Sequence, residues 1–145
     1  MKRLLAGFAL LLVLPLAFAG KPPVFATGDG AIRGYDPVAY FKQGKPTRGQ
    51  AEFSTEWQGA TYRFANADNL AAFKADPEAY APQYGGYCAY AVSQGYTASI
   101  DPKAWKIVDG KLYLNYSRSV QQLWNKDIPG YISAANNHWP AVLDR

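Results

Sequence analysis

Apolar and polar positions alternate in two stretches of this chain. In "AEFSTEWQGATYRFAN" the alternation continues on both sides of Gly59, and in "AWKIVDGKLYLNY" two alternating runs are joined by Asp109 and Gly110. A period of two is typical of half-buried strands, and an Asp-Gly pair favours a tight turn between strands. The pattern therefore predicts two antiparallel hairpins.

Helix signals lie before, between and after these hairpins. Asp36 is a suitable N-cap, Pro37 suits a first helical position and Gly44 suits a stop, which together predict a short helix. Asn66 can cap a second helix over "ADNLAAFKAD", and "YCAYAVSQG" predicts a third. Each of these helices is short and begins or ends at a recognisable residue.

The last third of the chain has the apolar spacing of amphipathic helices. Ser117 can cap the first of them, and Pro129 predicts a break before the second. The apolar positions are Val120, Leu123, Trp124 and Ile128 in the first helix, then Ile132, Ala135 and Trp139 in the second.

The order of these elements predicts an α+β fold, because hairpins and helices follow one another without a regular βαβ alternation. We expect short antiparallel hairpins packed against helices and a helical C-terminus. Residues 20–34 are rich in Gly and Pro and predict an extended lead-in with one short strand at 24–26. No internal repeat is visible in the sequence.

The first 19 residues have the features of a secretory signal peptide. Lys2 and Arg3 are followed by an uncharged apolar run, and "AFA" before Gly20 fits the signal peptidase. We therefore expect a mature protein that begins at Gly20, forms a single domain over residues 20–145 and is periplasmic or secreted. We expect no membrane span after the signal peptide is removed.

Charge and cysteine content exclude some classes of function. The formal net charge is +4, of which Lys2 and Arg3 supply two, and no cluster of basic residues follows. Nucleic acid is therefore not an expected partner. Cys88 is the single cysteine of the chain, so it cannot form an internal disulfide, and we expect it to be buried.

One segment resembles a known family. The pattern Y-R-F-A-N-x-x-N-x-x-x-F-x-x-D-P-x-x-Y runs from Tyr62 to Tyr80, and "GYDPVAYF" precedes it at residues 34–41. Both stretches resemble the YHS domain, and the rest of the chain is similar to exported bacterial proteins that contain this domain. The resemblance implies a small YHS-like fold.

The same resemblance implies that the family's metal chemistry is absent here. Metal-associated YHS domains carry cysteines at positions that correspond to Ala39, Ala65 and Asn69 of this chain. None of the three can supply a thiolate, which soft metals such as Cu(I) require.

The stretch around Cys88 is the strongest candidate for a binding site. Glycines allow a close approach of backbone or ligand, and tyrosine rings can line a groove. Tyrosines can equally cover a small core with their rings while their hydroxyls reach water. The candidate ligand-binding residues are Tyr84, Gly85, Gly86, Tyr87, Cys88 and Tyr90.

The sequence is compatible with three functions. The first is a non-enzymatic module that binds a small ligand or a periplasmic protein, both unidentified. The second is a metal-handling protein in which Cys88, with His138 or a carboxylate, holds a copper or zinc ion. The third is a thiol-dependent enzyme, for which the sequence has neither a second cysteine nor a histidine next to Cys88. The sequence favours the first.

Overall fold

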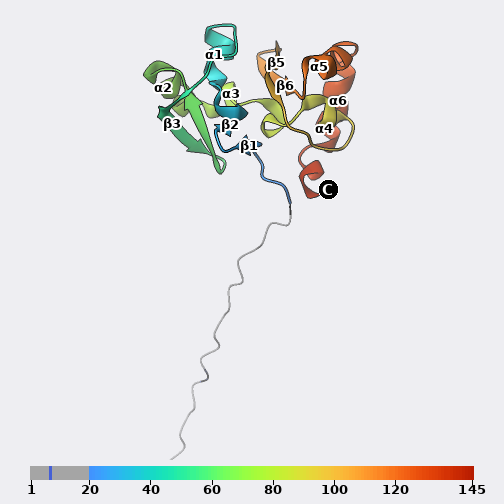
Figure 1. Ribbon diagram of the computed structural model, residues 1–145. Helices are drawn as coiled ribbons and strands as arrows, with labels where there is room; N and C mark the ends of the chain where they lie inside the picture. The colour runs from blue at the N-terminus through green and yellow to red at the C-terminus, as the bar shows by residue number, and fades with distance from the viewer. Residues whose placement is uncertain (1–6, 8–19) are drawn as a thin grey trace, which may run out of the picture.

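A computed structural model describes Gly7 and residues 20–145 of the chain. Over this range the fold is α+β, as expected, with two-stranded antiparallel sheets, helices packed around them and a helical C-terminus (Figure 1). The expected signal peptide lies outside the described residues, apart from Gly7. Within the described part of the chain, no helix is long and apolar enough to cross a bilayer.

The lead-in forms a small hairpin, and its first strand does not lie where the sequence predicts a strand. Strand β1 (Ala26–Thr27) pairs with β2 (Gly30–Ala31), whereas a strand was expected at 24–26. Val24, inside the expected strand, is buried in the core instead. The strand begins two residues later because its partner, Gly30–Ala31, follows a tight turn that fixes the register.

The first helices and the first hairpin agree with the sequence. Helix α1 (Pro37–Lys42) begins after Asp36, whose carboxylate accepts hydrogen bonds from the amides of Val38 and Ala39. The 3₁₀ turn η1 (Ile32–Gly34) precedes it, and β3 (Gln50–Trp57) and β4 (Ala60–Phe64) form the expected hairpin around Gly59. Asn66 caps α2 (Ala67–Ala75), and α3 (Pro77–Tyr80) adds one further turn.

The second half of the chain also contains the elements that were expected. They are helix α4 (Ala89–Ser93), the hairpin of β5 (Asp101–Val108) and β6 (Lys111–Asn115), helix α5 (Arg118–Asn125) and helix α6 (Ile128–His138). The structure adds two 3₁₀ turns that were not expected, η2 (Gln83–Gly86) and η3 (Ala141–Asp144). Ser117 caps α5. Pro129 lies in the first turn of α6, where its missing N–H removes no helical hydrogen bond.

Two hydrophobic clusters form the core. One gathers around Tyr62, Phe64 and Phe73 and extends to Leu112 and Leu114 of the second hairpin. The other gathers around Trp124 and Ala135, where α4, α5 and α6 meet. In Figure 1, β1–β4 with α1–α3 occupy one half of the molecule, and β5, β6 and α4–α6 occupy the other.

These halves repeat one backbone plan, although no internal repeat is visible in the sequence. In the first hairpin Trp57 pairs with Ala60, and in the second Val108 pairs with Lys111, 51 positions further along. Both hairpins shift register at the same point, between Gln50 and Ser54 in the first and between Asp101 and Trp105 in the second. Both then lead into a helix with an N-cap side chain, from Asn66 or Ser117.

Backbone angles before the hairpins repeat as well. Residues 32, 33 and 34 have φ values of 52°, 51° and 84°, and residues 84, 85 and 86 have values of 57°, 61° and 79°. The amide of Asp36 donates to the carbonyl of Thr47, and the amide of Cys88 donates to that of Ala98. Cys88 therefore occupies in the second repeat the place that Asp36 has in the first. The repeat is not visible in the sequence because the two halves share a backbone plan but differ in their side chains.

Candidate functional site

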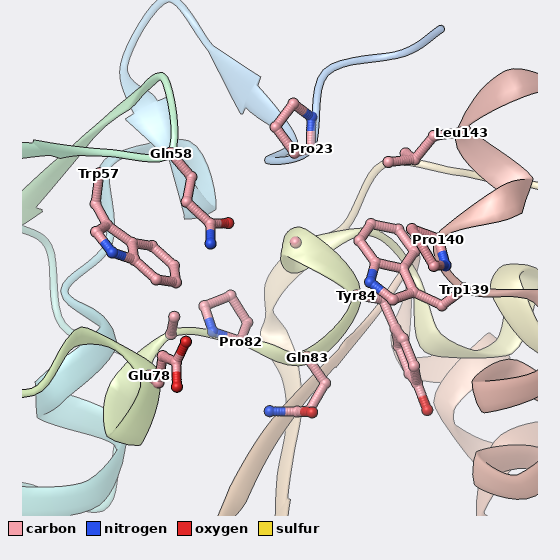
Figure 2. Close-up of a pocket in the computed structure, with 12 residues that line it drawn as sticks. Pro23, Trp57, Gln58, Glu78, Pro82, Gln83, Tyr84, Trp139, Pro140 and Leu143 are labelled. Atoms are coloured by element: carbon pink, nitrogen blue, oxygen red, sulfur yellow. The ribbon is translucent and has the colours of Figure 1, made fainter.

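A cavity of about 470 Å³ lies between the two repeats (Figure 2). This volume is within the range of small-molecule sites, roughly 300–1,000 Å³. Its lining comes from the lead-in, the first hairpin, α3, η2 and the C-terminal segment after α6. The lining residues are Pro23, Trp57, Gln58, Glu78, Ala81, Pro82, Gln83, Tyr84, Gly85, Trp139, Pro140 and Leu143.

Part of the lining is a constrained turn in η2. Tyr84 and Gly85 both have left-handed backbone angles, with φ values of 57° and 61°. A side chain on Gly85 would overlap the carbonyl oxygen of Pro23, so only glycine allows the lead-in to pass this close. The carbonyl of Gly85 accepts from the amide of Phe25 at 2.9 Å. This part of the cavity wall is therefore fixed by backbone contacts.

The phenol of Tyr84 is fixed from the side of α6. Its hydroxyl lies 2.9 Å from Oδ1 of Asn136, to which it donates a hydrogen bond. Burial raises the pKa of Tyr84 well above its ordinary value, and the neighbouring Tyr113 adds to the effect. The hydroxyl is therefore neutral at physiological pH and already has a partner.

Two indoles approach the cavity from opposite halves of the molecule. Trp57 extends from the end of β3, and its ring makes edge contacts with Tyr62 and Phe73 at centroid distances of 6.2 and 5.9 Å. Trp139 follows α6 and packs against Tyr84 at 6.0 Å. In Figure 2 the two rings lie on either side of the open space. Because other rings support them, both indoles are held in place before a ligand arrives.

Besides the Tyr84 hydroxyl and the two indole N–H groups, the polar side chains of the lining are two amides and one carboxylate. Gln58 lies at the turn of the first hairpin, Gln83 begins η2, and Glu78 lies on α3. Glu78 is solvent-exposed and is the single charged side chain among the residues that line this cavity. The cavity therefore combines aromatic faces, neutral hydrogen-bonding groups and one negative charge.

Two of the six ligand-binding candidates from the sequence, Tyr84 and Gly85, line the cavity. The other four lie outside that lining. Tyr87 is buried and its hydroxyl donates to the carbonyl of Pro22 at 2.8 Å, while Tyr90 packs edge-on against Tyr131. Gly86 and Cys88 are also buried. The structure does not bring the six together on one surface.

Cys88 is buried, as expected, with 1% of its surface exposed. Its sulfur accepts a hydrogen bond from the amide of Tyr116 at 3.2 Å and lies 3.6 Å from Oδ1 of Asn115. Burial raises the pKa of the Cys88 thiol above its ordinary value. A buried thiol with a raised pKa is a poor nucleophile, since the thiolate is the reactive form.

His138, the other metal candidate, lies at the C-terminal end of α6 beside Gly95 and is half-buried. Among the described residues, no group of three or more His, Cys, Asp or Glu side chains is placed to hold a metal ion. A stable copper or zinc site usually needs three or four donors. A centre built on Cys88 and His138 thus stays a prediction of the sequence alone.

The three positions where metal-associated YHS domains have cysteines converge on Asp36. Its carboxylate is fully buried and accepts from the amide of Ala39 at 3.2 Å, the amide of Ala65 at 2.8 Å and the side-chain amide of Asn69 at 2.7 Å. The amide of Val38 adds a fourth hydrogen bond at 2.8 Å. In this chain the three positions therefore supply N–H donors to one buried carboxylate and no thiolate.

Several cavity residues were missed from the sequence as site residues. Trp57 and Trp139 were identified only as members of apolar patterns, and nothing local marks Gln58, Glu78 or Gln83. Their shared property is position in space, because the cavity joins residues up to 120 positions apart. A local sequence signal existed only for the Tyr-Gly-Gly turn.

Comparisons with known proteins find a match for one part of the chain. No curated protein and no solved structure matches it significantly. A family model does match, over α1, the first hairpin, α2, α3 and the start of η2. Residues 38–84 are thus recognised as a YHS domain, in agreement with the resemblance found at residues 34–80.

Proposed function

We propose that this protein is an exported, non-enzymatic module that binds a small ligand in the cavity between its two repeats. The observation that carries the proposal is the cavity itself, which has an indole on each side and a wall fixed by the η2 turn. Export is supported by the signal-like sequence before Gly20.

The chemistry of the lining favours binding over catalysis. Its twelve residues include no serine, cysteine, histidine or lysine. The hydroxyl of Tyr84 is bonded to Asn136 and has a raised pKa, so it is a poor general base at neutral pH. Glu78 is left without a neighbouring nucleophile in the lining to activate.

A substitution that fills the cavity tests the proposal. Gln83 is half-buried in the lining, so Gln83→Trp would place an indole in the ligand's space. Gln94→Trp is the matched control, because Gln94 is exposed at the end of α4 and outside this lining. Thermal denaturation would be followed for the three proteins against a collection of small polar and aromatic compounds.

A ligand at a hundredfold excess over its Kd adds about 2.7 kcal/mol to stability. For a domain of this size that corresponds to a rise in Tm of roughly 10 °C. We expect at least one compound to raise the Tm of the wild type and of Gln94→Trp, but not of Gln83→Trp. The proposal fails if no compound stabilises the wild type, or if every stabilising compound acts equally on Gln83→Trp.

A further inference from the structure

The charges of the cavity restrict the class of ligand that it can hold. Its lining includes one carboxylate, Glu78, and no Lys, Arg or His. Pro23, Pro82 and Pro140 also line it, and proline has no backbone N–H to offer to an anion. Protein sites for anions depend on cationic side chains or on free backbone N–H groups. This lining is therefore unsuited to phosphates and carboxylates.

The aromatic groups of the lining also favour a cation over an anion. The face of an indole attracts a cation within about 6 Å of its centre, and indole is the strongest of the natural rings in this respect. Trp57 and Trp139 lie on opposite sides of the space, with Glu78 on the same side as Trp57 (Figure 2). Ammonium groups bearing methyl or alkyl substituents suit such a site because they are only weakly hydrated and contact apolar surface as well.

From this arrangement we infer that the ligand is a small organic ammonium ion, held between Trp57 and Trp139 with Glu78 as its counter-charge. The inference rests on the proposed function, since it names the class of ligand for the same cavity. Gln58 and Gln83 supply hydrogen bonds to a polar group elsewhere on the ligand. Both indoles are already packed against other rings, so little side-chain freedom is lost on binding.

Calorimetric titration with a matched pair of probes tests the charge. Choline is the cationic probe, and 3,3-dimethylbutan-1-ol is its uncharged isostere of nearly the same shape. We expect choline to bind the mature protein on the order of tenfold more tightly than the alcohol, because the alcohol keeps the apolar contacts but loses the attraction to the rings and to Glu78.

Variants assign this preference to the cavity. Glu78→Gln should weaken choline binding roughly 3- to 5-fold and leave the alcohol unchanged, because an exposed charge contributes modestly. Glu52→Gln removes another exposed carboxylate, outside the lining, and should change neither. Trp57→Phe keeps an aromatic ring against Phe73 and should also weaken choline binding.

The outcomes separate the inference from the proposed function. The ammonium inference is wrong, and the binding function stands, if choline and the alcohol bind equally. The same holds if choline does not bind but a neutral compound does, and Gln83→Trp blocks the binding of that compound. If no compound of any charge binds in a way that Gln83→Trp blocks, the binding function fails with it. Choline binding that Glu78→Gln does not weaken would also contradict the inference.

Discussion

Asp36 is the residue whose loss should destabilise this fold most clearly through hydrogen bonding. Its carboxylate has no exposed surface and accepts four hydrogen bonds, at 2.8 and 3.2 Å from the first turn of α1 and at 2.8 and 2.7 Å from Ala65 and Asn69. It therefore caps one helix and ties that helix to the end of the first hairpin and the start of α2.

The magnitude follows from the groups that Asp36→Ala would leave without an acceptor. Loss of the cap costs about 1 kcal/mol. The amide of Ala65 and the side chain of Asn69 would then lose their shared acceptor, at about 1–3 kcal/mol for each buried donor. Asn69 retains a longer contact with Gln43, at 3.3 Å, so its share lies at the lower end. We expect a total loss of roughly 3–5 kcal/mol.

Urea denaturation of the mature protein measures this loss, with Asn66→Ala as the comparison. Asn66 also caps a helix, but its side chain accepts a single hydrogen bond, from the amide of Asn69, so its removal should cost about 1 kcal/mol. Asp36→Asn keeps one acceptor oxygen but turns an N–H group toward existing donors, so it should lie between the two. An Asp36→Ala variant no less stable than Asn66→Ala would refute the reasoning.

Three further predictions concern Cys88, Gly85 and the N-terminus. Burial and a raised pKa should make Cys88 react with a thiol reagent on the order of 100-fold more slowly in the native protein than in urea, and equal rates would contradict its burial. Gly85→Ala should lower the free energy of unfolding by at least about 2 kcal/mol more than Gly44→Ala does. Both glycines have positive φ, but of the two only Gly85 would bring a side chain against backbone. Equal losses would disprove the close approach of Pro23. N-terminal sequencing of the exported protein should give Gly20 as the first residue, and a start at Met1 would exclude the signal peptide.

The sequence by itself determined the elements whose signals are local. A cap lies three residues from the amide that it binds, as Asn66 does from Asn69, and a two-residue turn fixes a hairpin such as the one around Asp109 and Gly110. Such signals are complete within a few positions, so they can be identified without knowing the fold. The short strand at Ala26–Thr27 was misplaced because its position depends on pairing rather than on propensity. The resemblance to the YHS domain, which the family match supports, likewise came from a contiguous pattern.

Only the tertiary structure decided what lies between these elements. Trp57, Glu78 and Trp139 line one cavity because the two repeats pack together, and no local pattern relates such distant positions. The repeat itself is a property of backbone angles and register, which many side chains can satisfy, so Asp36 and Cys88 occupy equivalent places with unrelated chemistry. The sequence could show that this chain has no cysteine at the positions where metal-associated YHS domains have them. That they surround a buried carboxylate depends on the packing of α1 against the start of α2, which brings residues 36 and 69 into hydrogen-bond contact.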